Sequence, residues 1–133
     1  MKAIKPLALI GIVALLSSCA STAKFPVSAV TPAAQITAKM KQDKNNNFKI
    51  AVTAKHLAAA DRLTPPKNNY IVWVLTDNGM VNNVGQLVIK NAEKASLTIT
   101  TSLSVKEIVI TAENQGELTY PSGIEISRTT FNK

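Results

Sequence analysis

Apolar and polar residues alternate with a period of two along most of the chain from residue 35 onward. This alternation places successive side chains on opposite faces of a β-strand, and no amphipathic helix of useful length competes with it. The pattern predicts about seven strands set off by turn-forming residues: 36–40, 48–54, 70–76, 85–90, 95–101, 106–113 and 124–130. We therefore expect an all-β fold, a single antiparallel β-sandwich of the immunoglobulin-like or Greek-key type, with a small barrel as the alternative.

The segments between the first strands differ in character. The polar run KQDKNNN, residues 41–47, predicts a tight loop, so the strands on either side of it should form a hairpin. Residues 55–66 hold three alanines and end in Pro65 and Pro66, which stop any regular element. We expect a compact crossover there, with at most a turn of 3₁₀ or α-helix.

The run YIVWVLT, residues 70–76, is apolar on both faces and has the strongest β-propensity in the chain, which is typical of a central strand. We predict that Trp73 points into the core together with Ile71 and Leu75, because its large ring removes much apolar area from water. The opposite row, Tyr70, Val72 and Val74, then has to be covered by a loop, a partner or the side chains of neighbouring strands. The predicted interaction surface consists of Tyr70, Val72, Val74 and Tyr120.

The first 19 residues have the order of a secretory signal. Lys2 and Lys5 precede an uncharged apolar run, 7–16, that is too short to span a bilayer, and two serines and the sole cysteine, Cys19, follow it. Leu16-Ser17-Ser18-Cys19 resembles the lipobox of bacterial lipoproteins. The resemblance implies that the Cys19 thiol carries diacylglycerol, that the chain is cut before Cys19, and that the freed amine is acylated, for example with palmitate.

This organisation predicts three parts. Residues 1–18 are a lipoprotein signal peptide that is removed, residues 19–34 are a lipidated tether rich in Ser, Thr and Pro, and residues 35–133 are the sandwich domain. Because Ala20 rather than Asp follows the lipidated cysteine, analogy with lipoprotein sorting in Gram-negative bacteria implies the outer membrane, with the domain facing the periplasm. In a Gram-positive cell the same anchor would lie in the plasma membrane. The membrane is then a partner through the anchor.

Charge and cysteine content narrow the function classes. The net charge is +7, two of the lysines leave with the signal, and the remaining basic residues are spread along the chain, which favours a solvated surface. Nucleic acid is a poor partner for a protein outside the cytoplasm. With Cys19 committed to lipid, no internal disulfide can form, so stability has to come from packing.

No constellation of residues supports catalysis, a cofactor or a metal. His56 is the sole histidine, and Ser122 lacks the Gly-x-Ser-x-Gly frame of a nucleophile elbow. The sequence from Asp43 to Asn47 fails as a calcium loop, since Phe48 replaces the glycine that such a loop requires. Glu113 ends a strand, and we expect its carboxylate to accept hydrogen bonds from backbone amides or to pair with a lysine. No site residue is assigned to catalysis, cofactor or metal.

A family resemblance spans roughly residues 52–126. It rests on the following positions: Tyr70 and Trp73; Asn82, Gly85 and Leu87; Ile108, Ile110, Thr111 and Glu113; Pro121 and Gly123. In this pattern the chain resembles the extracytoplasmic C-terminal domain of anti-sigma-K-type factors and of a group of uncharacterised bacterial proteins that share it. The matched residues are core and turn positions of a β-sandwich rather than a catalytic signature, so the resemblance implies the fold more than any activity. Those factors carry a cytoplasmic domain and a transmembrane helix before this module, whereas here a lipobox takes their place.

The sequence thus predicts a non-catalytic envelope lipoprotein whose β-sandwich binds or interacts with another envelope component, such as a protein partner. A periplasmic carrier of a sugar or peptide is the alternative, and it would need a pocket between the sheets or under residues 57–66. A hydrolase is the least favoured hypothesis, because it needs a cleft with clustered titratable side chains.

Overall fold

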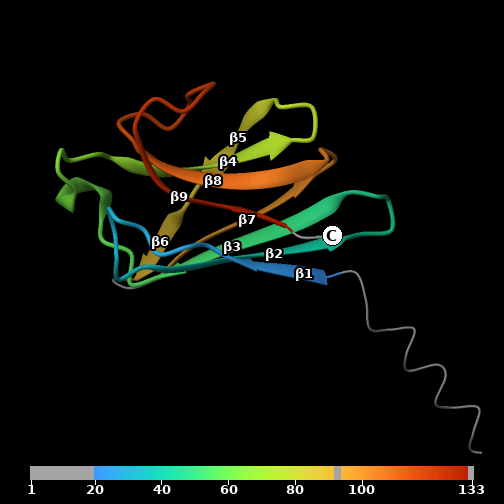
Figure 1. Ribbon diagram of the computed structural model, residues 1–133, viewed down its shortest axis with the longest axis horizontal. Coiled ribbons are helices and arrows are strands. Elements are labelled where there is room, and N and C mark those ends of the chain that lie inside the picture. The colour runs from blue at the N-terminus through green and yellow to red at the C-terminus, as the bar shows by residue number, and fades with distance from the viewer. Residues whose placement is uncertain (1–19, 92–93, 132–133) are drawn as a thin grey trace, which may run out of the picture.

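Two antiparallel β-sheets pack face to face in the computed structural model, which describes residues 20–91 and 94–131 (Figure 1). The predicted signal and Cys19 lie outside the described residues. Sheet A has the strand order β1 (Ala20–Lys24), β2 (Gln35–Gln42), β3 (Phe48–Lys55), β7 (Lys94–Thr101), β6 (Val88–Asn91). Sheet B has the order β5 (Val81–Gln86), β4 (Asn69–Thr76), β8 (Val105–Glu113), β9 (Ile124–Thr130). The predicted all-β sandwich is confirmed.

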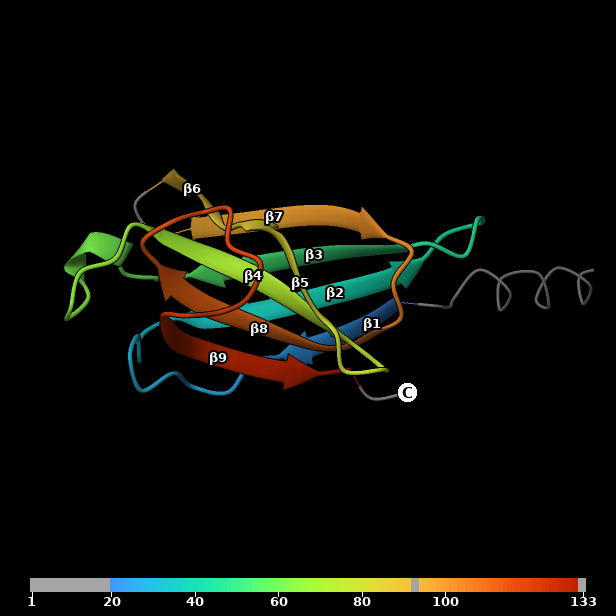
Figure 2. The same ribbon diagram turned by 90° about the horizontal axis from the view of Figure 1, so that it is seen from above.

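The connections give the sandwich its immunoglobulin-like character. Strands β2-β3-β7-β6 face strands β5-β4-β8-β9, and the chain passes from one sheet to the other between β3 and β4, β5 and β6, and β7 and β8. This is the Greek-key arrangement of an immunoglobulin-type domain, with β1 added beyond the first strand of sheet A. Figure 2 shows sheet B lying across sheet A from above. No helix in the described part of the chain is long and apolar enough to cross a membrane.

The predicted hairpin and crossover are both confirmed. Strands β2 and β3 pair in register from Gln35–Lys55 to Gln42–Phe48. In the loop between them, Oδ1 of Asp43 accepts hydrogen bonds from the amides of Asn45 and Asn47, at 2.8 and 3.0 Å, which closes an Asx-type turn. The crossover after β3 contains one 3₁₀ turn, η2 (Ala60–Arg62).

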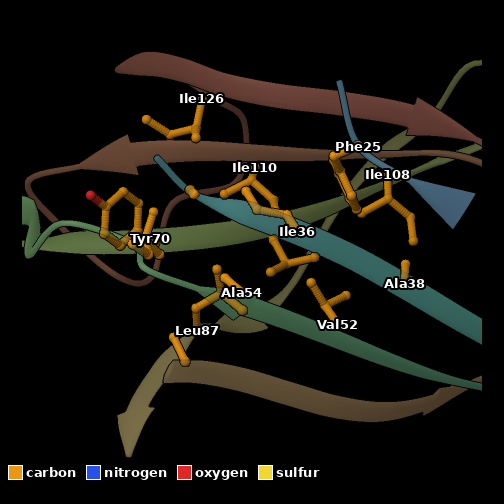
Figure 3. Close-up of a cluster of buried hydrophobic side chains, with 14 of the residues drawn as sticks. Phe25, Ile36, Ala38, Val52, Ala54, Tyr70, Leu87, Ile108, Ile110 and Ile126 are labelled. Carbon is orange, nitrogen blue, oxygen red and sulfur yellow. The ribbon is translucent and has the colours of Figure 1, made fainter. Parts of the chain in front are cut away.

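The main core fills the space between the two sheets (Figure 3). Sheet A contributes the even-numbered residues of β2 and β3, among them Ile36, Ile50 and Val52. Sheet B contributes Ile108 and Ile110, which are fully buried. Burying each such side chain stabilises the fold by about 1.5 to 3 kcal/mol relative to leaving it exposed, so the packing between the sheets supplies most of the stability.

Strand β4 has two buried faces, and the prediction assigned them the wrong way round. Tyr70, Val72 and Val74 point into the main core between the sheets, whereas Trp73 and Ile71 form a second, smaller cluster with Val109 on the other face of sheet B. Trp73 is fully buried, as predicted, but on the outer face. Alternation alone cannot tell the two faces apart when both rows are apolar.

The segment expected as a flexible tether begins with a strand. Residues 20–24 pair with β2 in register from Ala20–Lys41 to Lys24–Thr37, and Ala23 is buried against Ala38. The tether prediction is therefore wrong for this stretch. Its physical reason is that ASTAK contains only small and polar residues, so its alternation carries almost no hydrophobic contrast.

The predicted strand 85–90 divides between the two sheets. The chain leaves β5 and enters β6 at Leu87, which is buried and donates its N–H to the carbonyl of Tyr70 over 3.0 Å. Gly85 has φ of +136° beside a bulge in the β4–β5 pairing, a conformation that side chains rarely adopt. Ile89 on β6 is about half exposed. The sheet switch and β1 raise the number of strands in the described residues from about seven to nine.

Candidate functional site

The predicted interaction surface does not form as a patch. Val72 and Val74 are 1% and 0% exposed, and Tyr70 is 2% exposed, because sheet A covers this row of β4. These three residues are therefore corrected from surface to core. Tyr120 is 68% exposed, in the loop 114–123 between β8 and β9. Of the predicted surface residues, Tyr120 alone is available to a partner.

Tyr70 uses its polar end within the fold. Its hydroxyl donates a 2.5 Å hydrogen bond to the carbonyl of Ala58 in the crossover. Burial, with a smaller effect from the charge of Asp61, raises the pKa of Tyr70 to about 12. The phenol stays neutral and holds the crossover against β4.

A buried hydrogen-bond network lies under the loop 114–123. The indole N–H of Trp73 donates to Oγ1 of Thr111 over 2.8 Å, and the Thr111 hydroxyl donates to Oε2 of Glu113 over 2.6 Å. Ser122 donates to Glu113 twice, from its hydroxyl at 3.0 Å and from its amide at 3.2 Å. Three elements, β4, β8 and the end of the loop, are thereby tied to one carboxylate.

Glu113 is a charged acceptor in a nearly closed site. Burial by itself raises the pKa of Glu113, but the hydrogen bonds from Thr111, Gly123 and Ser122 outweigh it and hold the pKa below its ordinary value. A carboxylate that accepts from two hydroxyls and two amides is held ionised and immobile. The prediction that Glu113 bonds backbone amides is confirmed.

Further contacts fix the same loop on the outer face of sheet B. The side-chain amide of Asn83 on β5 donates to the carbonyls of Gly116 and Leu118, both at 3.0 Å. Leu118 packs on the cluster that contains Trp73. The loop thus covers Trp73, and Figure 2 shows it crossing over sheet B. Asn83 was not among the predicted site residues, because an asparagine in a short strand gives no hydrophobic signal.

The outer face of sheet A carries the second notable feature. Register and alternation place on this face, which we call the lysine face, the side chains of Lys24, Lys39, Lys41, Lys49, Lys55 and Lys94. All are exposed, and the other positions of this face in β1, β2, β3 and β7 are Ala, Thr, Ser and Gln. No Asp or Glu occupies this face in the described strands. The prediction of basic residues spread along the chain did not anticipate this concentration, which strand alternation and strand pairing create.

One of the cations of sheet B, on β9, is paired with carboxylates. Arg128 on β9 forms ion pairs with Glu107 at 2.7 Å and Glu125 at 2.6 Å. Its hydrogen bonds to Glu125 lower the pKa of that carboxyl. In the described part of the chain no carboxylate forms such a pair with a residue of the lysine face.

A groove with a volume of about 370 Å³ opens at one end of the lysine face. Its wall combines Phe25, Val27 and Ala34 with polar side chains of sheet A, including Lys24 and Lys55. The carrier hypothesis placed a pocket between the sheets or under residues 57–66, but the space between the sheets is filled by the main core. This groove lies instead where the segment between β1 and β2 meets the start of β2 and the end of β3.

No protein-family model matches the chain, and no curated protein matches it. The resemblance to the outer domain of anti-sigma-K-type factors stays a prediction.

Proposed function

We propose that the protein is an envelope lipoprotein, anchored through Cys19, whose sandwich is a non-catalytic interaction module that presents the loop 114–123 to a partner. The anchor places the domain at the outer membrane, on the periplasmic side. The observation that carries the proposal is the exposure of Tyr120 on a loop that a buried network holds in one conformation.

The construction of the loop supports a binding role. Connecting segments positioned by a rigid scaffold commonly carry binding residues. Here Glu113 and Asn83 fix the two halves of the loop, while the large side chain of Tyr120 is left in solvent. Tyrosine supplies wide contact area at a low cost in conformational entropy, so an exposed tyrosine on a fixed loop suits protein recognition.

The polar network supports a module without catalysis. The hydroxyl of Ser122 donates to Glu113, and the remaining acceptor positions of that carboxylate are used by Thr111 and by backbone amides. A hydrolase needs a base with a pKa near the working pH. Glu113 has its pKa moved in the opposite direction.

Site-specific photo-crosslinking in the native envelope tests the proposal. A photoreactive amino acid at Tyr120 should give one dominant protein adduct, and the same residue at Thr98, exposed on sheet A, should not. Cys19→Ser should reduce the adduct, because the unanchored domain is diluted from the membrane. Equal crosslinking from both positions, or none from Tyr120, would contradict a partner site on the loop.

A small-ligand carrier remains the second candidate, and the groove beside Lys24 and Lys55 favours it. Its mixture of apolar and cationic residues suits an amphipathic anion rather than a neutral sugar. Native mass spectrometry of protein purified without denaturation would detect such a ligand, and Phe25→Ala should release it. A ligand-free spectrum from the native host would remove this candidate.

A further inference from the structure

The lysine face places like charges directly against each other. In the β2–β3 pairing Lys41 lies opposite Lys49, and in the β3–β7 pairing Lys55 lies opposite Lys94. Directly opposed residues of an antiparallel pair share one face with their Cβ atoms about 5 Å apart, and like charges there are destabilising. Two such pairs on one face, with no acidic residue among them, indicate that the face meets a layer of negative charge.

The position of Lys41 and Lys49 indicates where that layer of negative charge lies. Ala20, the residue that follows Cys19, is paired with Lys41, and Lys41 is paired with Lys49. Lys41 on β2 and Lys49 on β3 therefore lie one and two strands away from Ala20 on β1, where the chain leaves the fold toward the proposed anchor. Because β1 starts at Ala20, no flexible spacer separates the sheet from that point. A tether this short keeps sheet A within reach of the bilayer surface.

We propose that the lysine face lies against the anionic lipid headgroups of the membrane that holds the anchor, so that sheet B and Tyr120 point away from the membrane. The orientation rests on the proposed lipidation of Cys19. A polybasic surface beside an acyl anchor acts as a second membrane signal, and each lysine near an anionic surface strengthens the attraction about fivefold. Figure 1 shows sheet A and sheet B as the two opposite layers of the molecule.

Lysine footprinting of the full lipidated protein tests the orientation. The protein is inserted by its anchor into the outer leaflet of preformed vesicles, either of phosphatidylcholine alone or with phosphatidylglycerol added, and then treated with a membrane-impermeant acetylating reagent. We expect Lys39, Lys41 and Lys49 to react about fivefold more slowly in the anionic vesicles. Lys106, exposed on β8 of sheet B, should react at the same rate in both, and high salt should remove the difference.

Two matched double variants distinguish the effect of the lysine face from the effect of net charge. Lys41→Glu with Lys49→Glu should abolish the protection of Lys39, whereas Arg62→Glu with Lys106→Glu changes the net charge by the same amount away from the face and should leave it intact. All four positions are exposed, so both variants should fold, which circular dichroism checks.

The outcomes distinguish this proposal from the one on which it rests. Failure of the protein to enter any vesicle would contradict the anchor itself. Entry with equal reaction of Lys39 and Lys106 in anionic vesicles would contradict the orientation alone. Protection that appears only when peptidoglycan is added to phosphatidylcholine vesicles would assign the face to the cell wall and overturn the lipid proposal.

Discussion

The indole N–H of Trp73 donates a 2.8 Å hydrogen bond to the hydroxyl of Thr111, on the face of sheet B that lies away from sheet A. The same hydroxyl donates to Glu113, so a single threonine links the only tryptophan of the chain to the carboxylate that holds the loop 114–123. The most buried aromatic side chain is thus coupled to the most exposed one, Tyr120, through the loop that covers it.

Thr111→Val should be more destabilising than Thr111→Ser. Valine keeps the shape but leaves the Trp73 N–H without an acceptor and removes one donor to Glu113, at a cost of about 1 to 3 kcal/mol. Serine retains the hydroxyl and loses only a methyl group. Urea unfolding followed by Trp73 fluorescence measures both variants. Equal losses would mean that the hydroxyl contributes nothing.

Glu113→Gln should lower the free energy of unfolding at neutral pH by about 1 to 3 kcal/mol, since charge-assisted hydrogen bonds from Thr111, Ser122 and Gly123 are weakened. Hydrogen exchange at the amides of Ser122 and Gly123 should accelerate as the loop loosens. Glu117→Gln, an exposed change in the same loop, should alter stability by less than about 0.5 kcal/mol.

The loss caused by Glu113→Gln should depend on pH with a definite sign. The hydrogen bonds lower the folded-state pKa of Glu113 below its ordinary value of 4.5, so its stabilising contribution is fully present above that value. The contribution disappears as the pH falls through the lowered folded-state pKa. Wild type and variant should therefore differ most near neutrality and converge in acid. A difference that grows below pH 4.5 would contradict the assignment.

Two glycine substitutions should differ in severity because their causes differ. A Cβ at Gly123 would overlap the carbonyl oxygen of Ala112 and press on Glu113, so Gly123→Ala should cost about 3 kcal/mol or more. A Cβ at Gly79 meets open space, and only its φ of +87° is unfavourable, which predicts about 1 kcal/mol for Gly79→Ala. Thermal unfolding ranks the two, and the reverse order would argue against the close approach at Gly123.

Substitutions to aspartate at two neighbouring positions test whether residues 20–24 form a strand. Ala23→Asp places a charge against Ala38 in the core and should cost about 2 to 4 kcal/mol, whereas Thr22→Asp lies on the lysine face opposite Lys39 and should be nearly neutral. Chemical denaturation of the chain without residues 1–18 measures both. A flexible tether would tolerate the two changes equally.

Sequence alone predicted the elements whose polar and apolar positions contrast. The hairpin around Asp43 and the strand bearing Ile50 alternate strongly, so their existence was predicted correctly. Strand β1 was missed because Ala23 is its only buried residue. The faces of β4 were inverted because only the long-range cover of Trp73 by the loop decides between two apolar rows.

The lysine face could be predicted from the sequence more fully than the contacts that hold the loop 114–123. The lysine face was present in the sequence, since Lys39, Lys41 and Lys49 are odd-numbered in strands whose core residues are even-numbered. The opposition of Lys55 and Lys94 required the β3–β7 pairing, which links segments far apart in the chain. The role of Asn83 in holding the loop likewise depends on a long-range contact that no local pattern indicates.

Mass spectrometry of the N-terminal peptide of the mature protein, purified from its native host, tests the central claim most directly. The account predicts a chain that begins at Cys19 and carries a thioether-linked diacylglycerol, followed without a spacer by the residues of β1. A chain that retains residues 1–18, or a Cys19 with a free thiol, would contradict it.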